Sequence, residues 1–101
     1  MLATFKSSLS DNEPSADLSV PLKALWFAAR GEWERAHTLV MNVESREAAW
    51  VHAYLHRVEG DLPNARYWYV QAGREPASGA LESEWLAISQ FLLVQKPGPQ
   101  R

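Results

Sequence analysis

His52 and His56 are the residues of this sequence best placed to bind a metal ion. They are four positions apart, which puts both imidazoles on one face of a helix, one turn apart. That is the spacing of two ligands to a single metal ion, although no glutamate follows His52 as the metalloprotease pattern His-Glu-x-x-His requires. A metal site needs at least one further ligand. Glu84, Glu82 or His37 would have to reach the pair through the fold.

The same pair has a simpler interpretation without a metal. Both imidazoles would then lie in a helix interface and form hydrogen bonds with Tyr67, Tyr69 or a carboxylate. Such buried imidazoles are expected to be neutral at pH 7, because desolvation disfavours the charged form. Two hypotheses therefore stand for His52 and His56. One is a divalent metal site completed by Glu84, and the other is a buried histidine pair with no cofactor.

A second set of residues has the composition of a binding surface. Trp50, Tyr54 and Arg57 form a stripe on the helix that carries the histidines. Aromatic residues and arginine dominate the binding hot spots of protein interfaces, so we predict that this stripe holds a protein or peptide partner. The expected extensions of the surface are Tyr67, Tyr69 and Arg74. The alternative is core packing, with an arginine whose aliphatic stem is buried.

Composition argues against several classes of function. The 101 residues suffice for one domain, and the absence of cysteine excludes disulfides, thiolate catalysis and Cys-based metal sites. The net charge is −2 and no basic run occurs, so nucleic acid is not an expected partner. No signal peptide or membrane-spanning stretch is recognised, so we expect a cytoplasmic protein without a membrane partner. Phosphate-binding loops and nucleophile elbows are missing, which favours a non-enzymatic role and leaves catalysis open.

The elements that must position these residues are helices. Three side chains are placed to accept hydrogen bonds from the first free amides of a helix: Ser19, Ser45 and Asp61. Three glycines are placed to end helices in the left-handed conformation: Gly31, Gly60 and Gly73. With the apolar periodicity, these signals predict helices over residues 19–31, 32–41, 45–59, 61–73 and 80–94. The short connections require the first four to form two antiparallel hairpins.

The predicted domain covers residues 19–95, and its helix 45–59 should be central because apolar residues occur nearly all around it. We expect residues 1–18 to be a mostly flexible arm, in which Leu2, Phe5 and Leu9 have the spacing of a short docked turn. Residues 96–101 are expected to be a disordered tail. Helix 80–94 is expected to cap the domain with a polar outer face. That face would consist of Glu82, Ser83, Glu84, Ser89 and Gln90.

A seven-residue pattern of residue types occurs twice in the chain. RGEWERA at residues 30–36 returns as EGDLPNA at residues 59–65, a shift of 29 positions (59 − 30). The turn of glycine, acid, apolar residue, two polar residues and alanine resembles the tetratricopeptide repeat over residues 19–73. The shift is shorter than the usual period of about 34 residues, and no proline closes the first repeat. The chain therefore looks like a diverged, shortened relative of the tetratricopeptide repeat proteins.

This resemblance implies an all-α fold. Two hairpins would stack in a right-handed α-α superhelix, and the first helix of each would line a concave binding face. A third copy would need glycine near position 89, where the chain has Ser89. The helix over residues 80–94 would then take the place of the third repeat's first helix and cap the stack.

Two further segments resemble a group of small bacterial proteins of unknown function. They are WVHAYLHR at residues 50–57 and YWYVQAGR at residues 67–74. This resemblance implies a helical fold and no activity. The sequence therefore favours a small interaction module, a scaffold or adapter. The alternatives are a metal- or small-ligand-binding protein using His52 and His56, with or without catalysis, and a homodimeric structural protein.

Overall fold

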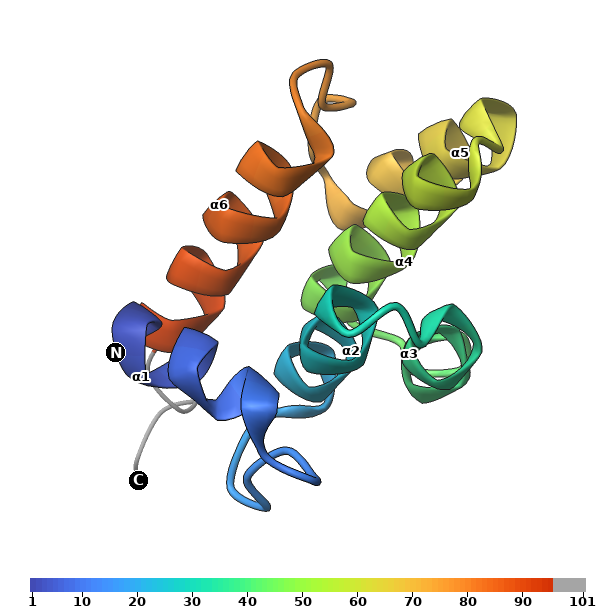
Figure 1. The fold of residues 1–101 in the computed structure, drawn as a ribbon. Coiled ribbons are helices and arrows are strands. Elements are labelled where there is room, and N and C mark those ends of the chain that lie inside the picture. The colour runs from blue at the N-terminus through green and yellow to red at the C-terminus, as the bar shows by residue number, and fades with distance from the viewer. Residues whose placement is uncertain (96–101) are drawn as a thin grey trace, which may run out of the picture.

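The computed structural model describes residues 1–95, and all regular structure in that range is helical. The elements in chain order are α1 (Leu2–Ser7), the 3₁₀ turn η1 (Ser8–Ser10), α2 (Val20–Ala29), α3 (Trp33–Val40), α4 (Arg46–Glu59), α5 (Leu62–Ala72) and α6 (Leu81–Val94) (Figure 1). The prediction of an all-α fold is confirmed, with α1 as a sixth helix. The tail expected at residues 96–101 lies outside the described residues. None of the described helices combines the length and the apolar character needed to cross a membrane.

The helices begin and end where the sequence marks them. The Ser45 hydroxyl accepts a hydrogen bond from the Ala48 amide at 3.1 Å and starts α4. Gly60 ends α4 with a φ of 85°, in the left-handed region that a residue with a Cβ rarely adopts. The other predicted caps and terminators behave in the same way: Ser19, Asp61, Gly31 and Gly73. Local chemistry therefore sets the bounds of α2, α4 and α5, whereas α3 begins after Glu32 without a side-chain cap and ends before Met41 without a glycine.

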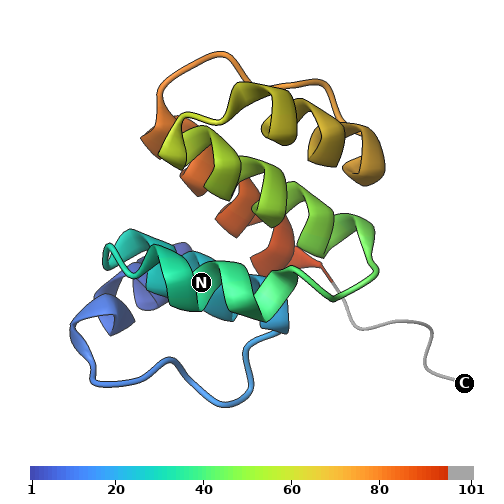
Figure 2. The ribbon, with the colours of Figure 1, turned by 90° about the vertical axis from the view of Figure 1, so that its right-hand side faces the viewer.

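Two helical hairpins form the body of the molecule. Helix α2 packs on α3, α4 packs on α5, and contacts between α3 and α4 hold the hairpins side by side (Figure 2). Helix α6 contacts both α2 and α4, and α1 packs against α6 (Figure 1). In a simple repeat array each unit contacts only its neighbours. Here α6 instead spans the two hairpins, so it occupies a different position from the first helix of a third repeat.

The core is centred on α4. Its residues 48–56 are all buried, as the apolar pattern of this helix predicts. The expected polar outer face of α6 is found only in part, because Glu84 and Ser89 are 6% and 0% exposed. Glu84 points inward because Trp50 of α4 and Tyr69 of α5 donate hydrogen bonds to its carboxylate.

The N-terminal segment differs from the flexible arm that its composition predicts. Phe5 is 4% exposed and stacks on Trp85, with ring centroids 5.7 Å apart. The Trp26 indole nitrogen donates to the Ser8 hydroxyl at 3.1 Å, and the Arg30 guanidinium donates to the carbonyl oxygen of Leu9 at 2.6 Å. Residues 2–10 are therefore docked and helical, because Phe5 fills a space beside α6 that would otherwise expose Trp85.

Candidate functional site

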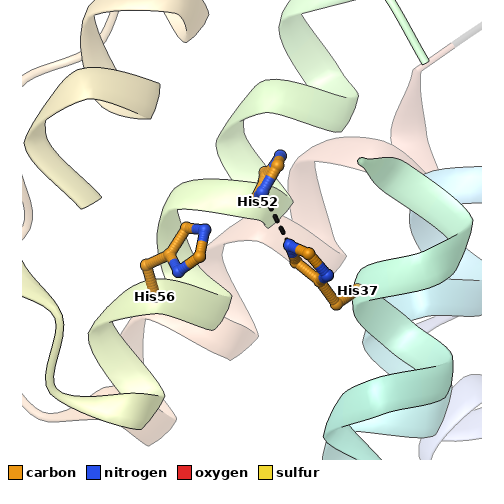
Figure 3. Close-up of side chains that lie close together, drawn as sticks. All are labelled: His37, His52 and His56. Carbon is orange, nitrogen blue, oxygen red and sulfur yellow. Dashed lines mark hydrogen bonds between the residues drawn. The ribbon is translucent and has the colours of Figure 1, made fainter. Parts of the chain in front are cut away.

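Three imidazoles meet between α3 and α4 (Figure 3). His52 and His56 lie one turn apart on α4, as predicted, and His37 reaches them from α3. The Nε2 atoms of His37 and His52 are 3.0 Å apart and share a hydrogen bond. The ring centroid of His56 lies 4.8 Å from that of His52 and 5.4 Å from that of His37. The third member of the cluster is therefore His37, and the expected ligand Glu84 is absent because α6 packs against another face of α4.

Two tryptophans enclose the histidine cluster. Trp68 of α5 stacks on His52 with ring centroids 4.0 Å apart, and Trp33 of α3 stacks on His37 at 4.7 Å. The Trp33 indole nitrogen donates to the carbonyl oxygen of Leu55 at 2.7 Å, which holds this ring in place. The rings therefore restrict the rotation of the imidazoles they cover.

Burial in the cluster favours the neutral forms of His37 and His52, because it lowers the pKa of each. Burial, followed by the neighbouring His37 and His56, lowers the pKa of His52 to about 4. Burial is also the main cause that lowers the pKa of His37. On the outer side, Nδ1 of His56 lies 2.7 Å from a carboxylate oxygen of Glu59. Nδ1 of His52 is buried and has no hydrogen-bond partner among the described residues.

A second polar cluster surrounds the buried carboxylate of Glu84. The Trp50 indole donates to its Oε2 at 3.2 Å and the Tyr69 hydroxyl to the same oxygen at 2.5 Å. Arg57 donates to Oε1 at 2.8 Å and, through its other terminal nitrogen, to the carbonyl oxygen of Gly79 at 2.5 Å. The bond to Glu84 raises the pKa of the Arg57 guanidinium, and burial followed by this carboxylate raises the pKa of Tyr69.

Helix α6 covers most of the aromatic stripe that we expected to face a partner. Tyr54 and Tyr69 are 7% and 1% exposed, and burial raises the pKa of Tyr54 to about 12. Arg57 is paired with Glu84. These three residues therefore lie in the core, as the alternative interpretation of the stripe proposed. Tyr67 is 56% exposed and lines a hollow beside the α3–α4 connection.

Trp50 and Arg74 line a groove that stays open between α4, the end of α5 and α6. The groove has a volume of about 840 Å³. The guanidinium of Arg74 lies 3.4 Å from the ring centroid of Trp50 and 4.8 Å from that of Phe91, which is 40% exposed. Arg46 lines the same groove. Its guanidinium lies 3.8 Å from the point that a Cβ atom would occupy if Gly73 were alanine. The small side chains of the lining are Ala72, Ala77, Ala80 and Ala87.

The sequence indicates His37 as one of three residues that could join His52 and His56, but it does not indicate Arg46 and Phe91 in the groove. His37 was recognised only as a residue that the fold could bring close. Arg46 and Phe91 carry no local signal, because the groove depends on the course of the loop between α5 and α6. Comparison of the chain with protein-family models, with curated proteins and with solved structures gives no match.

Proposed function

We propose that this protein is a small helical interaction module, an adapter whose groove holds a segment of a partner protein. The observation that carries the proposal is the groove itself, which contains aromatic rings and an arginine, Arg74, that forms no ion pair with any of residues 1–95. Phe91 is 40% exposed and offers apolar area, whereas Trp50 is 8% exposed and forms the floor of the groove beneath Arg74, which lies over both rings. Aromatic residues and arginine are the types that supply most of the binding energy in protein interfaces.

Charge indicates the chemistry of the partner segment. Arg57 is neutralised by Glu84, whereas Arg46 and Arg74 form no ion pair with any of residues 1–95. Glu47 and Glu75 also line the groove, and Glu47 accepts a hydrogen bond from Gln95. A planar guanidinium binds a carboxylate through two parallel hydrogen bonds. The alanines of the lining leave room for an apolar side chain beside these two arginines. We therefore propose a partner segment that carries an apolar anchor next to an acidic residue.

The two hairpins support a diverged tetratricopeptide-like relationship, which stays a proposal. Repeats of this kind present helical surfaces to other proteins. In this chain α6 packs on α2 and α4, which would otherwise offer a binding face. The groove along α6 is the part of that face that stays open to a ligand. A cytoplasmic location and a bacterial source stay predictions from the sequence.

A displayed library of peptides that pair Asp or Glu with Leu or Phe tests the proposal. The peptide enriched on the wild-type protein is then titrated by fluorescence anisotropy. Replacing Arg74 by alanine should weaken binding about tenfold or more, because a charge-assisted hydrogen bond is lost. Replacing Ala87 by tryptophan should have a similar effect by filling the groove. The matched control is Arg66→Ala on the exposed face of α5, which should leave the affinity unchanged.

Two outcomes would reject the groove. One is that no peptide is enriched, and the other is that Ala87→Trp binds the enriched peptide as tightly as the wild type. Sedimentation at two protein concentrations tests the homodimer alternative. A dimer that the Ala87→Trp variant cannot form would identify a second copy as the occupant.

A further inference from the structure

We propose that His37, His52 and His56 together bind one divalent transition metal ion of the zinc class, through Nε2 of each imidazole. This site lies between α3 and α4, away from the groove that α6 lines, and does not depend on the proposed interaction function.

The spacing of the imidazoles suits such an ion. Zinc binds histidine nitrogen at about 2.0–2.1 Å, which places two ligand nitrogens of a tetrahedral site about 3.3 Å apart. The Nε2 atoms of His37 and His52 are already 3.0 Å apart. One nitrogen from each of the three residues falls within 4.8 Å of the others. A small rotation of His56 is therefore enough to complete a three-nitrogen site.

Glu59 provides the outer contact that metal-bound histidines usually have. Its carboxylate lies 2.7 Å from Nδ1 of His56. Metal-ligating histidines commonly donate their second N–H to a carboxylate, which fixes the tautomer and makes the ligand more basic. The proton held on Nδ1 leaves the Nε2 lone pair of His56 free to coordinate.

Metal binding would change one hydrogen bond of the cluster, the one between His37 and His52. Of the two nitrogens of His52, Nε2 is bonded to His37 and Nδ1 is buried without a partner among the described residues. A bound metal at Nε2 of His52 and His37 would replace their shared hydrogen bond with two coordinate bonds and fix the remaining proton of His52 on Nδ1.

The ligand set selects the class of ion. Imidazole nitrogens suit zinc, copper, nickel and iron, whereas magnesium and calcium take oxygen ligands. Three protein ligands leave a fourth position for water or a small ligand, unlike the closed four-ligand sites of structural zinc.

A neighbouring group of possible ligands makes a sharp test possible. His56, Glu59 and Asp61 also present donor atoms within 4.8 Å of one another, on a more exposed surface. The two arrangements share His56 but differ in their other members. Asp61→Asn changes the ligand of the exposed group while keeping a residue that can cap α5. His37→Gln changes only the proposed site.

The experiment is a titration of metal-stripped protein with Zn²⁺ in competition with a chromogenic chelator. The wild type should bind one ion per chain, and its thermal unfolding midpoint should rise because the ion binds only the folded state. His37→Gln should abolish this binding, Asp61→Asn should leave it unchanged, and Glu59→Gln should weaken it about 10- to 100-fold. Binding that Asp61→Asn abolishes and His37→Gln spares would place the ion at the exposed group and overturn the proposal.

A second measurement covers the case in which His37→Gln does not fold. Zn²⁺ is added to wild-type protein labelled with ¹⁵N, and the imidazole nitrogens are followed by long-range correlation spectra. All three Nε2 resonances should shift together and saturate at one equivalent. Absence of saturable binding, or shifts confined to His56, would overturn the proposal.

Discussion

Glu84 shows how one residue of α6 joins this helix to two others. Its carboxylate accepts hydrogen bonds from Trp50 and Arg57 of α4 and from Tyr69 of α5, and Arg57 also donates to the carbonyl oxygen of Gly79 in the loop before α6. The carboxylate side chain is 4% exposed and that of Arg57 is 13% exposed. Each charge of this buried pair offsets the cost of burying the other, because either charge alone would be unpaired in a low-dielectric interior.

Replacing Arg57 by methionine should therefore destabilise the fold strongly. Methionine keeps much of the apolar stem but leaves Glu84 without a counter-charge, which costs about 3–5 kcal/mol. Urea unfolding followed by circular dichroism measures the change. Arg66→Met on the exposed face of α5 is the control and should stay within about 0.5 kcal/mol of the wild type. A loss of less than about 1 kcal/mol for Arg57→Met would show that the pair contributes little.

Tyr69 should make stability fall at alkaline pH. Its ordinary pKa is 10.0, and burial followed by the hydrogen bond to Glu84 raises the pKa in the folded protein. Above pH 10 the unfolded chain loses this proton while the folded protein keeps it, so the free energy of unfolding decreases as pH rises. Tyr69→Phe should cost about 2 kcal/mol at neutral pH because the bond to the carboxylate is lost.

The difference between the two proteins should then narrow above pH 10, since the variant has no hydroxyl to ionise. Urea unfolding of both proteins from pH 7 to 12 measures this convergence. A constant difference across the series would contradict the raised pKa of Tyr69.

At the scale of elements, the helices could be predicted because their signals are local. Ser45 and Gly60 bound α4 through contacts with their immediate neighbours in the chain, so the sequence alone reveals them. The docking of α1 could not be predicted, because it depends on Trp85, a residue eighty positions after Phe5 (85 − 5). A short polar segment carries no local signal for a partner so far away.

The same distinction explains the candidate sites. His52 and His56 are one turn apart on one helix, so their pairing follows from spacing alone. His37 contacts His52 only because α3 packs on α4. Arg57 pairs with Glu84 only because α6 packs against α4. Sequence periodicity gives the face on which a residue lies, but not the element that will cover that face.

Two glycines with different backbone conformations provide a test at this scale. Gly60 ends α4 with a φ of 85°, and an added Cβ would meet no atom within 4 Å. Gly60→Ala should therefore lose about 1–2 kcal/mol from backbone strain alone. Gly79 lies outside the left-handed region with equally open surroundings, so Gly79→Ala should be neutral or stabilise by up to about 1 kcal/mol. Thermal and urea unfolding compare the two variants. Equal changes in stability would contradict the conclusion that Gly60 needs a left-handed backbone conformation and Gly79 does not.

At the scale of the whole molecule, the N-terminal segment belongs to the core. Phe5 stacks on Trp85 of α6, and Ser8 accepts a hydrogen bond from Trp26 of α2. Helix α1 therefore closes the end of the molecule at which α2 and α6 meet, and its removal would expose aromatic surface there.

Phe5→Ala should cost about 3 kcal/mol, the usual loss when a buried aromatic ring is replaced by a methyl group. Urea unfolding measures the loss, and limited proteolysis should cut within residues 1–18 faster than in the wild type. Val70→Ala is the control because Val70 is 73% exposed, and it should change stability by less than about 0.5 kcal/mol. An unchanged midpoint for Phe5→Ala would mean that α1 does not contribute to the folded core.

The position of α6 across both hairpins determines when the fold can close during synthesis. A chain leaves the ribosome from its N-terminus, so α1 and the two hairpins emerge before residues 81–94. Until then the helix is missing against which three residues pack: Phe5, Trp50 and Arg57. The carbonyl oxygen of Leu25 also lacks its hydrogen-bond donor, the indole of Trp85, which lies sixty residues further along the chain. The nascent hairpins therefore carry an uncovered aromatic face, and a chaperone that binds such faces would act on this protein up to the release of α6.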